Sequence, residues 1–169
     1  MEQRYGEEKY RLEQHRFRLY ANGLPLMFPC TRMVPGDEGA LTSDPNITLN
    51  ECACVLQYAQ TCFEGLKAYT TEDGHIVTFR PNLNGERMEN SAKRLEMPVF
   101  PKDRFVDAIV KLVEANADYV PPYGSGATLY IRPYMFGTNA VIGVKPADEY
   151  QFRAFCTPVG PYFEGRRKA

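Results

Sequence analysis

The order of the predicted elements is the feature that most constrains the fold. Between residues 63 and 160, a hairpin comes first, two helices follow, and two further strands complete the segment. Strands grouped before and after a helix pair predict an α+β domain, with a mainly antiparallel sheet and helices packed on one face. The predicted strands are 66–70, 75–79, 127–137 and 149–160, and the predicted helices are 82–98 and 102–120.

Each predicted helix has one apolar face. The first can be capped by Asn82 and is stopped by Pro98, and the second is followed by two consecutive prolines. Side chains at helical spacing are expected to point toward the sheet. They are Met88, Ala92 and Leu95 in the first helix, and Phe105, Ile109, Leu112, Val113 and Asn116 in the second.

The length and charge bound the class of protein. A chain of 169 residues with 44% apolar residues is typical of one globular domain. We expect residues 1–49 to be a loop-rich N-terminal segment of that domain, 50–163 its body and 164–169 a linker or tail. A net charge of -1 favours neither nucleic acid nor an anionic membrane as a partner. No export signal is evident, so we expect a cytoplasmic protein with reduced cysteines.

Two common kinds of site have no sequence support. Cys52 and Cys54 lack a second pair of ligands at zinc spacing, and the two histidines, His15 and His75, are far apart. We therefore expect no metal site. Neither a G-x-G-x-x-G turn nor a Walker A motif is present, so the usual nucleotide signatures are missing.

Arg132 stands in the middle of an apolar and aromatic strand. Side chains alternate between the faces of a strand, which places Tyr130, Arg132 and Tyr134 together, opposite Leu129, Ile131 and Met135. A guanidinium beside two phenols suits a carboxylate, which it can bind through two hydrogen bonds. A structural ion pair with a Glu or Asp explains the same spacing equally well, and the pattern leaves both interpretations open.

Arg80 stands at the end of the second hairpin strand, directly before Pro81 and a helix. Alternation along this strand places Ile76, Thr78 and Arg80 on one face. A cation and free amides converge at such a junction, which suits a phosphate. A helix-capping or surface arginine is the simpler interpretation. Lys67, on the first hairpin strand, is expected to face solvent.

Six segments occur in an order that resembles the N-terminal part of the branched-chain amino acid aminotransferases. The segments are FEGLKAY (63–69), FRP (79–81), NSAKRLEMP (90–98), YVPPYGSGATLYIRP (119–133), GVKPADEY (143–150) and TPVGPYF (157–163). These enzymes use pyridoxal phosphate and have the D-amino-acid-aminotransferase-like fold. The resemblance covers about residues 50 to 163, and residues 1–49 follow the pattern only loosely.

The resemblance implies a role for six residues. Arg80 would bind the phosphate of the cofactor, and Tyr130 and Arg132 would receive the substrate carboxylate. The remaining three, Tyr58, Phe63 and Gly65, would shape an apolar substrate pocket, and the region of Tyr58 would reach the site of a partner subunit in a homodimer. The parent reaction would transfer an amino group between leucine, isoleucine or valine and 2-oxoglutarate. The two guanidinium groups should then lie on a common concave side of the sheet.

The resemblance also implies an incomplete site. The Schiff-base lysine of the family lies in a C-terminal domain, and no lysine of this chain corresponds to it. We expect the chain alone to bind the cofactor weakly and not to transaminate, and we expect that C-terminal domain as a partner. A related D-amino-acid aminotransferase or an aminodeoxychorismate lyase is a second possibility. A non-catalytic binding module that kept the fold is a third.

Overall fold

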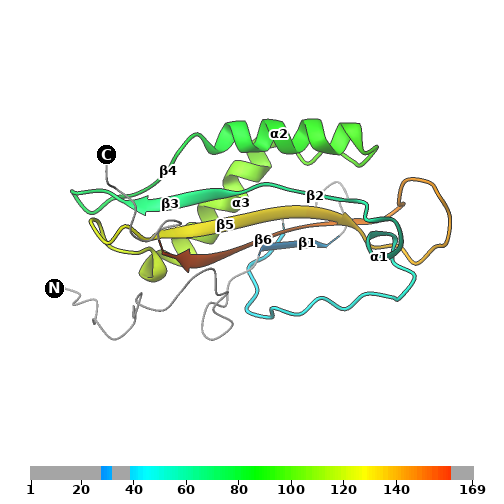
Figure 1. The fold of residues 1–169 in the computed structure, drawn as a ribbon, viewed down its shortest axis with the longest axis horizontal. Coiled ribbons are helices and arrows are strands. Elements are labelled where there is room, and N and C mark those ends of the chain that lie inside the picture. The colour runs from blue at the N-terminus through cyan, green and yellow to red at the C-terminus, as the bar shows by residue number, and fades with distance from the viewer. Residues whose placement is uncertain (1–27, 32–38, 161–169) are drawn as a thin grey trace, which may run out of the picture.

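The computed structural model describes residues 28–31 and 39–160, which contain one sheet, the helices that cover it and the loops between them (Figure 1). The sheet has six strands in the order β1-β6-β5-β3-β4, and β2 also pairs with β5. Every pair is antiparallel. The strands are β1 (Phe28–Thr31), β2 (Thr61–Phe63), β3 (Leu66–Thr70), β4 (Ile76–Thr78), β5 (Thr128–Gly137) and β6 (Tyr150–Val159).

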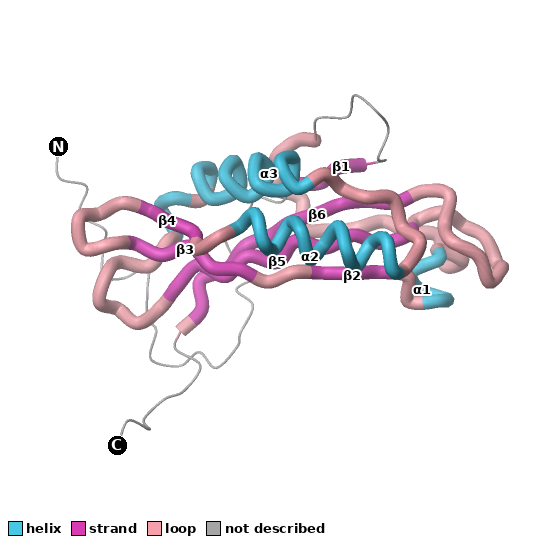
Figure 2. Tube along the Cα trace, turned by 90° about the horizontal axis from the view of Figure 1, so that it is seen from above, coloured by secondary structure: helices cyan, strands magenta, loops and turns pink. Residues whose placement is uncertain are grey.

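Two long helices, α2 (Pro81–Arg94) and α3 (Lys102–Ala115), cover the same face of this sheet (Figure 2). A short helix, α1 (Cys54–Tyr58), precedes β2, and a 3-10 turn (Ala117–Tyr119) follows α3. The predicted α+β class, with an antiparallel sheet and helices on one face, is confirmed. None of the described helices is long and apolar enough to cross a bilayer.

The core lies between the sheet and the helices. Phe152 of β6 stacks on Phe100 with ring centroids 3.9 Å apart, and Phe105 of α3 meets the same ring edge-on. From α3, the predicted apolar face is buried as expected, and the Asn116 amide donates to the Leu112 carbonyl at 2.8 Å. Such aromatic and aliphatic contacts hold the sheet face that is opposite the candidate site.

Several predicted boundaries are wrong. Helix α2 begins at Pro81, so its N-cap is Arg80 and not Asn82. It ends at Arg94 in a turn closed by two backbone bonds, from Met97 N–H to the Ala92 carbonyl and from Glu96 N–H to the Lys93 carbonyl. The helix therefore stops before it reaches Pro98.

Other elements differ from the prediction for local reasons. Leu95 follows the end of α2 and is exposed, although it was expected on the apolar face. Helix α3 ends at Ala115, five residues before the predicted end. Strand β4 ends at Thr78, so alternation does not extend to Arg80. The elements α1, β1 and β2 were not predicted, because each is too short to show a period.

The predicted domain boundaries stay predictions. The tail 164–169 lies outside the described residues, and so does most of the segment 1–49. In its described part, β1 pairs with β6, and residues 39–49 form no helix or extended strand.

Candidate functional site

Strand β5 carries the site on its less buried face. Leu129, Ile131 and Met135 are completely buried beneath the helices. Tyr130, Arg132 and Tyr134 alternate with them and are half-buried on the other face. The predicted separation of the two faces is therefore confirmed. Burial raises the pKa of the Tyr134 hydroxyl above its ordinary value, and nearby Arg153 works in the opposite direction.

Arg132 is held by two aromatic neighbours. Its Nε donates a hydrogen bond to the Tyr130 hydroxyl at 2.9 Å. Its guanidinium carbon lies 4.2 Å from the centroid of the Phe63 ring, a distance at which a cation is attracted to the ring face. Among the residues that the structure describes, Arg132 forms no ion pair with a carboxylate. The structural ion pair that the sequence pattern left open is therefore not formed within this part of the chain.

Gly65 lies directly against Tyr130. A Cβ added to this glycine would stand 2.7 Å from the Tyr130 hydroxyl oxygen, closer than real Cβ contacts come. Glycine here therefore permits a close approach, and the missing side chain is what lets the phenol reach Arg132.

A cavity of about 370 Å³ opens beside these residues. It joins the start of α2, where Arg80 lies, to Tyr130 on β5. Arg132 is not part of its lining and is reached through the Tyr130 hydroxyl. The lining consists of Gly65, Leu66, Lys67, Tyr69, Phe79, Arg80, Leu83, Asn84, Arg87 and Tyr130.

Arg80 enters this cavity from a helix end and not from a strand face. It is exposed, and its backbone has φ 47°, in the left-handed region. Pro81 occupies the first helical position, which its fixed φ suits. In the described part of the chain, the Arg80 side chain has no hydrogen bond or ion pair. A helix N-terminus with such a cation is favourable for a phosphate.

The other two predicted residues, Phe63 and Tyr58, lie in different parts of the structure. Phe63 is 61% exposed and covers Arg132, whereas Tyr58, at the end of α1, lines a second cavity of about 400 Å³. The two cavities share no lining residue. The structure therefore brings together Arg80, Gly65 and Tyr130 around one cavity, with Phe63 and Arg132 beside it, and it places Tyr58 elsewhere.

Lys67 differs from its expected place. It pairs with Tyr130 in the β3–β5 ladder, is half-buried, and lines the first cavity. The solvent-facing position predicted for it is wrong, because the face of β3 that carries it borders the cavity.

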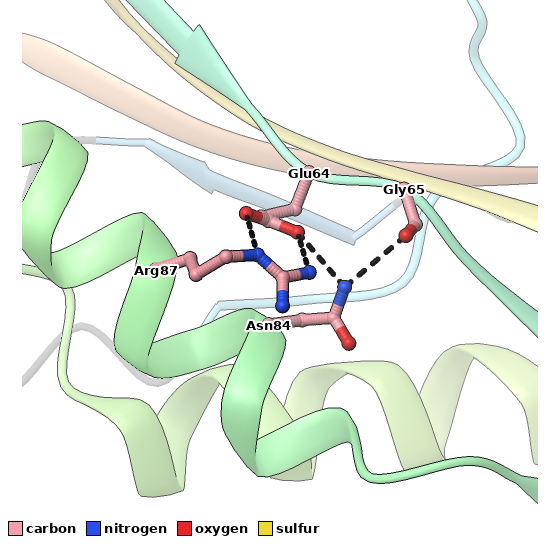
Figure 3. Close-up of polar contacts among 4 residues, drawn as sticks. All are labelled: Glu64, Gly65, Asn84 and Arg87. Atoms are coloured by element: carbon pink, nitrogen blue, oxygen red, sulfur yellow. Dashed lines mark hydrogen bonds and ion pairs between the residues drawn. The ribbon is translucent and has the colours of Figure 1, made fainter.

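Three polar residues beside the cavity were not singled out from the sequence as a group. The Glu64 carboxylate accepts two hydrogen bonds from Arg87, at 3.1 and 2.8 Å, and a third from the Asn84 amide at 2.8 Å (Figure 3). The same amide nitrogen donates to the Gly65 carbonyl at 3.1 Å. Hydrogen bonding to Glu64 raises the pKa of Arg87. Asn84 and Arg87 are three residues apart and so share one helix face. This spacing alone did not single them out, because their common partner Glu64 is distant in the sequence.

The described residues contain no group of acids, cysteines or histidines that could hold a metal ion. The polar groups that converge on the cavity are cations, amides and phenols. Such a set suits an anionic organic ligand with a phosphate or carboxylate group.

Comparison with known proteins identifies the class to which this fold corresponds. The architecture is that of the branched-chain aminotransferases. A crystal structure of the enzyme from the archaeon Thermoproteus uzoniensis with norvaline superposes with a TM-score of 0.66 at 22% identity, over 84% of this chain and 43% of that one. The T.th. branched-chain amino acid aminotransferase with pyridoxamine 5'-phosphate gives a TM-score of 0.66 at 23% identity, over 85% of this chain and 42% of that one. At these identities the likeness establishes the fold alone.

Sequence relatives specify the resemblance further. The branched-chain-amino-acid aminotransferase of Haemophilus influenzae is 53% identical over 129 residues, which cover 76% of this chain and 38% of the relative. A methionine aminotransferase of Arabidopsis thaliana is 42% identical over 160 residues, 93% of this chain and 45% of the relative. No family model matches the chain. The predicted resemblance to branched-chain aminotransferases is confirmed, and the chain spans less than half the length of these relatives.

Proposed function

We propose that this chain is the N-terminal part of a pyridoxal-phosphate-dependent branched-chain amino acid aminotransferase. The complete enzyme would transfer an amino group between leucine, isoleucine or valine and 2-oxoglutarate. The observation that carries the proposal is the cavity lined by both Arg80 and Tyr130, whose hydroxyl accepts a hydrogen bond from Arg132. The names of the relatives support an enzyme over a non-catalytic module.

Arg80 would bind the phosphate of the cofactor. Arg80 is the N-cap residue of α2 and lines the cavity, and the helix dipole at this end also favours negative charge. The cavity, at about 370 Å³, is within the size range of small-molecule sites. The residues present therefore fit the phosphate end of the cofactor, which when bound supplies an electron sink for the amino transfer.

Tyr130 and Arg132 would receive the substrate carboxylate. Tyr130 accepts the Nε–H of Arg132, which turns the guanidinium and leaves its two terminal nitrogens without a hydrogen-bond acceptor in the described part of the chain. Those two nitrogens match the spacing of two carboxylate oxygens. The Phe63 ring packs against the guanidinium, with its centroid 4.2 Å from the guanidinium carbon, and helps to hold the cation in place for an anion.

Phe63 and Gly65 would form the apolar wall that receives the branched side chain. Pockets distinguish aliphatic side chains by only about 1–3 kcal/mol per methylene, so a substrate range that also includes methionine is compatible with this wall. We propose that Tyr58 acts at the site of a partner subunit in a homodimer, since it lies outside the first cavity. A cytoplasmic location is part of the same proposal.

The groups that complete the site would come from a C-terminal domain. None of the lysines of this chain corresponds to the cofactor-binding lysine of the family. The chain alone is therefore expected to hold the cofactor weakly, because a phosphate contact is one of several that normally act together.

The test combines the 169-residue chain with a separately expressed C-terminal part of the Haemophilus influenzae relative. Leucine and methionine are each assayed with 2-oxoglutarate. We expect turnover from the mixture only, and we expect Arg132→Lys to raise KM roughly tenfold or more, because lysine keeps the charge and loses the paired hydrogen bonds.

Lys111→Met serves as the control, since this lysine pairs with Asp107 on the surface of α3. The control should leave KM unchanged. A folded, stable complex with no turnover on either substrate would refute the proposal and favour a non-catalytic binding module.

A further inference from the structure

The joint between β2 and β3 is anchored to helix α2. Both strands pair with β5, and Glu64 and Gly65 connect them. The Glu64 N–H donates to the Pro133 carbonyl of β5 at 2.9 Å, while its side chain points to α2 (Figure 3). There it meets Asn84 and Arg87. The joint is therefore held from the sheet by its backbone and from the helix by its side chain.

The Glu64 carboxylate and the Asn84 amide are largely shielded from water, whereas the Arg87 side chain is 58% exposed. Only 11% of the Glu64 side chain is exposed, and Asn84 is 6% exposed. A carboxylate at this depth needs its hydrogen-bond partners, because a buried charge without partners costs more folding free energy than an exposed one. The geometry of the joint therefore depends on Asn84 and Arg87 together.

Both residues that flank Glu64 contact the proposed carboxylate site. Phe63, on one side, covers the Arg132 guanidinium. Gly65, on the other, abuts the Tyr130 hydroxyl to which Arg132 donates. The Asn84 amide also holds the Gly65 carbonyl directly. A displacement of the joint would consequently move the covering ring and the phenol at the same time.

We infer that Asn84 and Arg87, acting through Glu64, are positioning residues that set the Tyr130–Arg132 pair in its orientation for a carboxylate. The inference rests on the proposed function for the identity of the ligand. It adds a physical link between the two ends of the site, since α2 begins directly after Arg80 and carries the anchoring pair in its first two turns. Arg132 is thus oriented through Glu64 and the two residues that flank it.

The first test needs no ligand. Tyrosine labelled with ¹³C at the ring carbon that bears the hydroxyl is incorporated into the full chain, and Tyr130→Phe assigns the Tyr130 signal. We expect Glu64→Gln and Asn84→Ala to move this signal, because the phenol loses its fixed contact with Gly65. Arg87→Lys keeps the charge but loses the paired hydrogen bonds. We expect this variant to fold and to move the Tyr130 signal less than the other two variants do.

Glu86→Gln is the matched control. Like Glu64→Gln, it replaces a carboxylate by an amide, but on α2 itself, where Glu86 pairs with Lys102 of α3 at 3.1 Å. This variant should leave the Tyr130 signal in place. If Glu64→Gln and Arg87→Lys lower the urea midpoint but leave the Tyr130 signal at its wild-type position, the network is only structural and the inference is wrong.

The second test measures binding of 4-methylvalerate, a leucine-shaped monocarboxylate, by NMR titration. We expect Glu64→Gln and Asn84→Ala to weaken binding roughly tenfold, the equivalent of one misdirected hydrogen bond to a charged group, while Glu86→Gln binds as the wild type does. Wild-type affinity in both anchoring variants would overturn the inference. Absence of binding by the wild-type chain would be compatible with the proposed function, because the C-terminal domain completes the site, and the ligand-free tyrosine signals would then decide the role of Asn84 and Arg87. The proposed function itself is decided by turnover of the mixture with the C-terminal part.

Discussion

Gly65 and Tyr130 lie so close together that position 65 has no room for a Cβ. The glycine allows the phenol to approach within a distance that a Cβ would prevent. Sequence alternation correctly placed Tyr130 and Arg132 on one face of a strand, because the period of a strand is a local property. It could not show that a glycine beside another strand makes room for the hydroxyl.

Gly65→Ala is expected to lower the free energy of unfolding by about 1–3 kcal/mol, since the added methyl group collides with the Tyr130 hydroxyl. Gly65→Ala in a Tyr130→Phe background should lower the free energy of unfolding clearly less. Without the hydroxyl, the nearest ring carbons stand 3.4 Å from the Cβ position, an ordinary contact distance. Urea denaturation of the four proteins of this cycle measures the coupling. Strictly additive costs would show that the collision is not the cause.

Helix α2 ends in a turn that normally favours glycine. The bonds from Met97 N–H to the Ala92 carbonyl and from Glu96 N–H to the Lys93 carbonyl are those of a Schellman motif. Glu96 occupies the left-handed position of this motif with φ 54°. The prediction from Pro98 placed the end too late because the motif, and not the proline, stops the helix. At the other end, Arg80 takes a left-handed conformation before Pro81, which no propensity in the sequence indicated.

Glu96→Gly is expected to stabilise the chain by about 0.5–1 kcal/mol, because glycine adopts this conformation without the steric cost of a Cβ. Glu114→Gly is the control for the same chemical change, since Glu114 lies within α3, where glycine should cost up to about 1 kcal/mol. Thermal or urea unfolding compares the two variants with the wild type. If both variants lose stability alike, the left-handed cap is not strained.

On the scale of the whole molecule, the packed layer between sheet and helices holds two thiols whose ionisation burial opposes. Cys156 pairs with Ile131 in the β5–β6 ladder and is buried, and burial raises the pKa of its thiol to about 12. Burial, together with the nearby Glu64 charge, raises the pKa of Cys62 to about 11. In the unfolded chain both thiols ionise near their ordinary pKa, about 8.5.

We therefore expect stability to fall as the pH rises above that ordinary value. Between it and the folded-state pKa of about 12, the unfolded state releases a proton from Cys156 that the folded state retains, so the free energy of unfolding decreases by up to about 1.4 kcal/mol per pH unit. Urea denaturation at about pH 8 and about pH 10, on either side of the ordinary thiol pKa, measures the loss. Cys156→Ala should lose less stability over this interval than the wild type, whereas Cys52→Ser should lose as much. An equal loss in Cys156→Ala would show that this thiol is not responsible.

The sequence by itself determined the class of fold, the two long helices with their buried faces, and the face of β5 that carries Tyr130, Arg132 and Tyr134. It also pointed to the resemblance that the comparisons confirmed. These features depend on periods of two and 3.6 residues and on short ordered motifs, which neighbouring residues set among themselves.

Only the tertiary structure decided which of these residues meet. It placed Arg80 at a helix end beside the cavity, moved Lys67 into the lining, and left Tyr58 at a second cavity. It also joined Glu64 to Asn84 and Arg87, twenty and more residues away in the chain. Contacts of this kind depend on how the sheet and α2 pack against each other, and no local pattern carries that information, because packing is set by all the elements together.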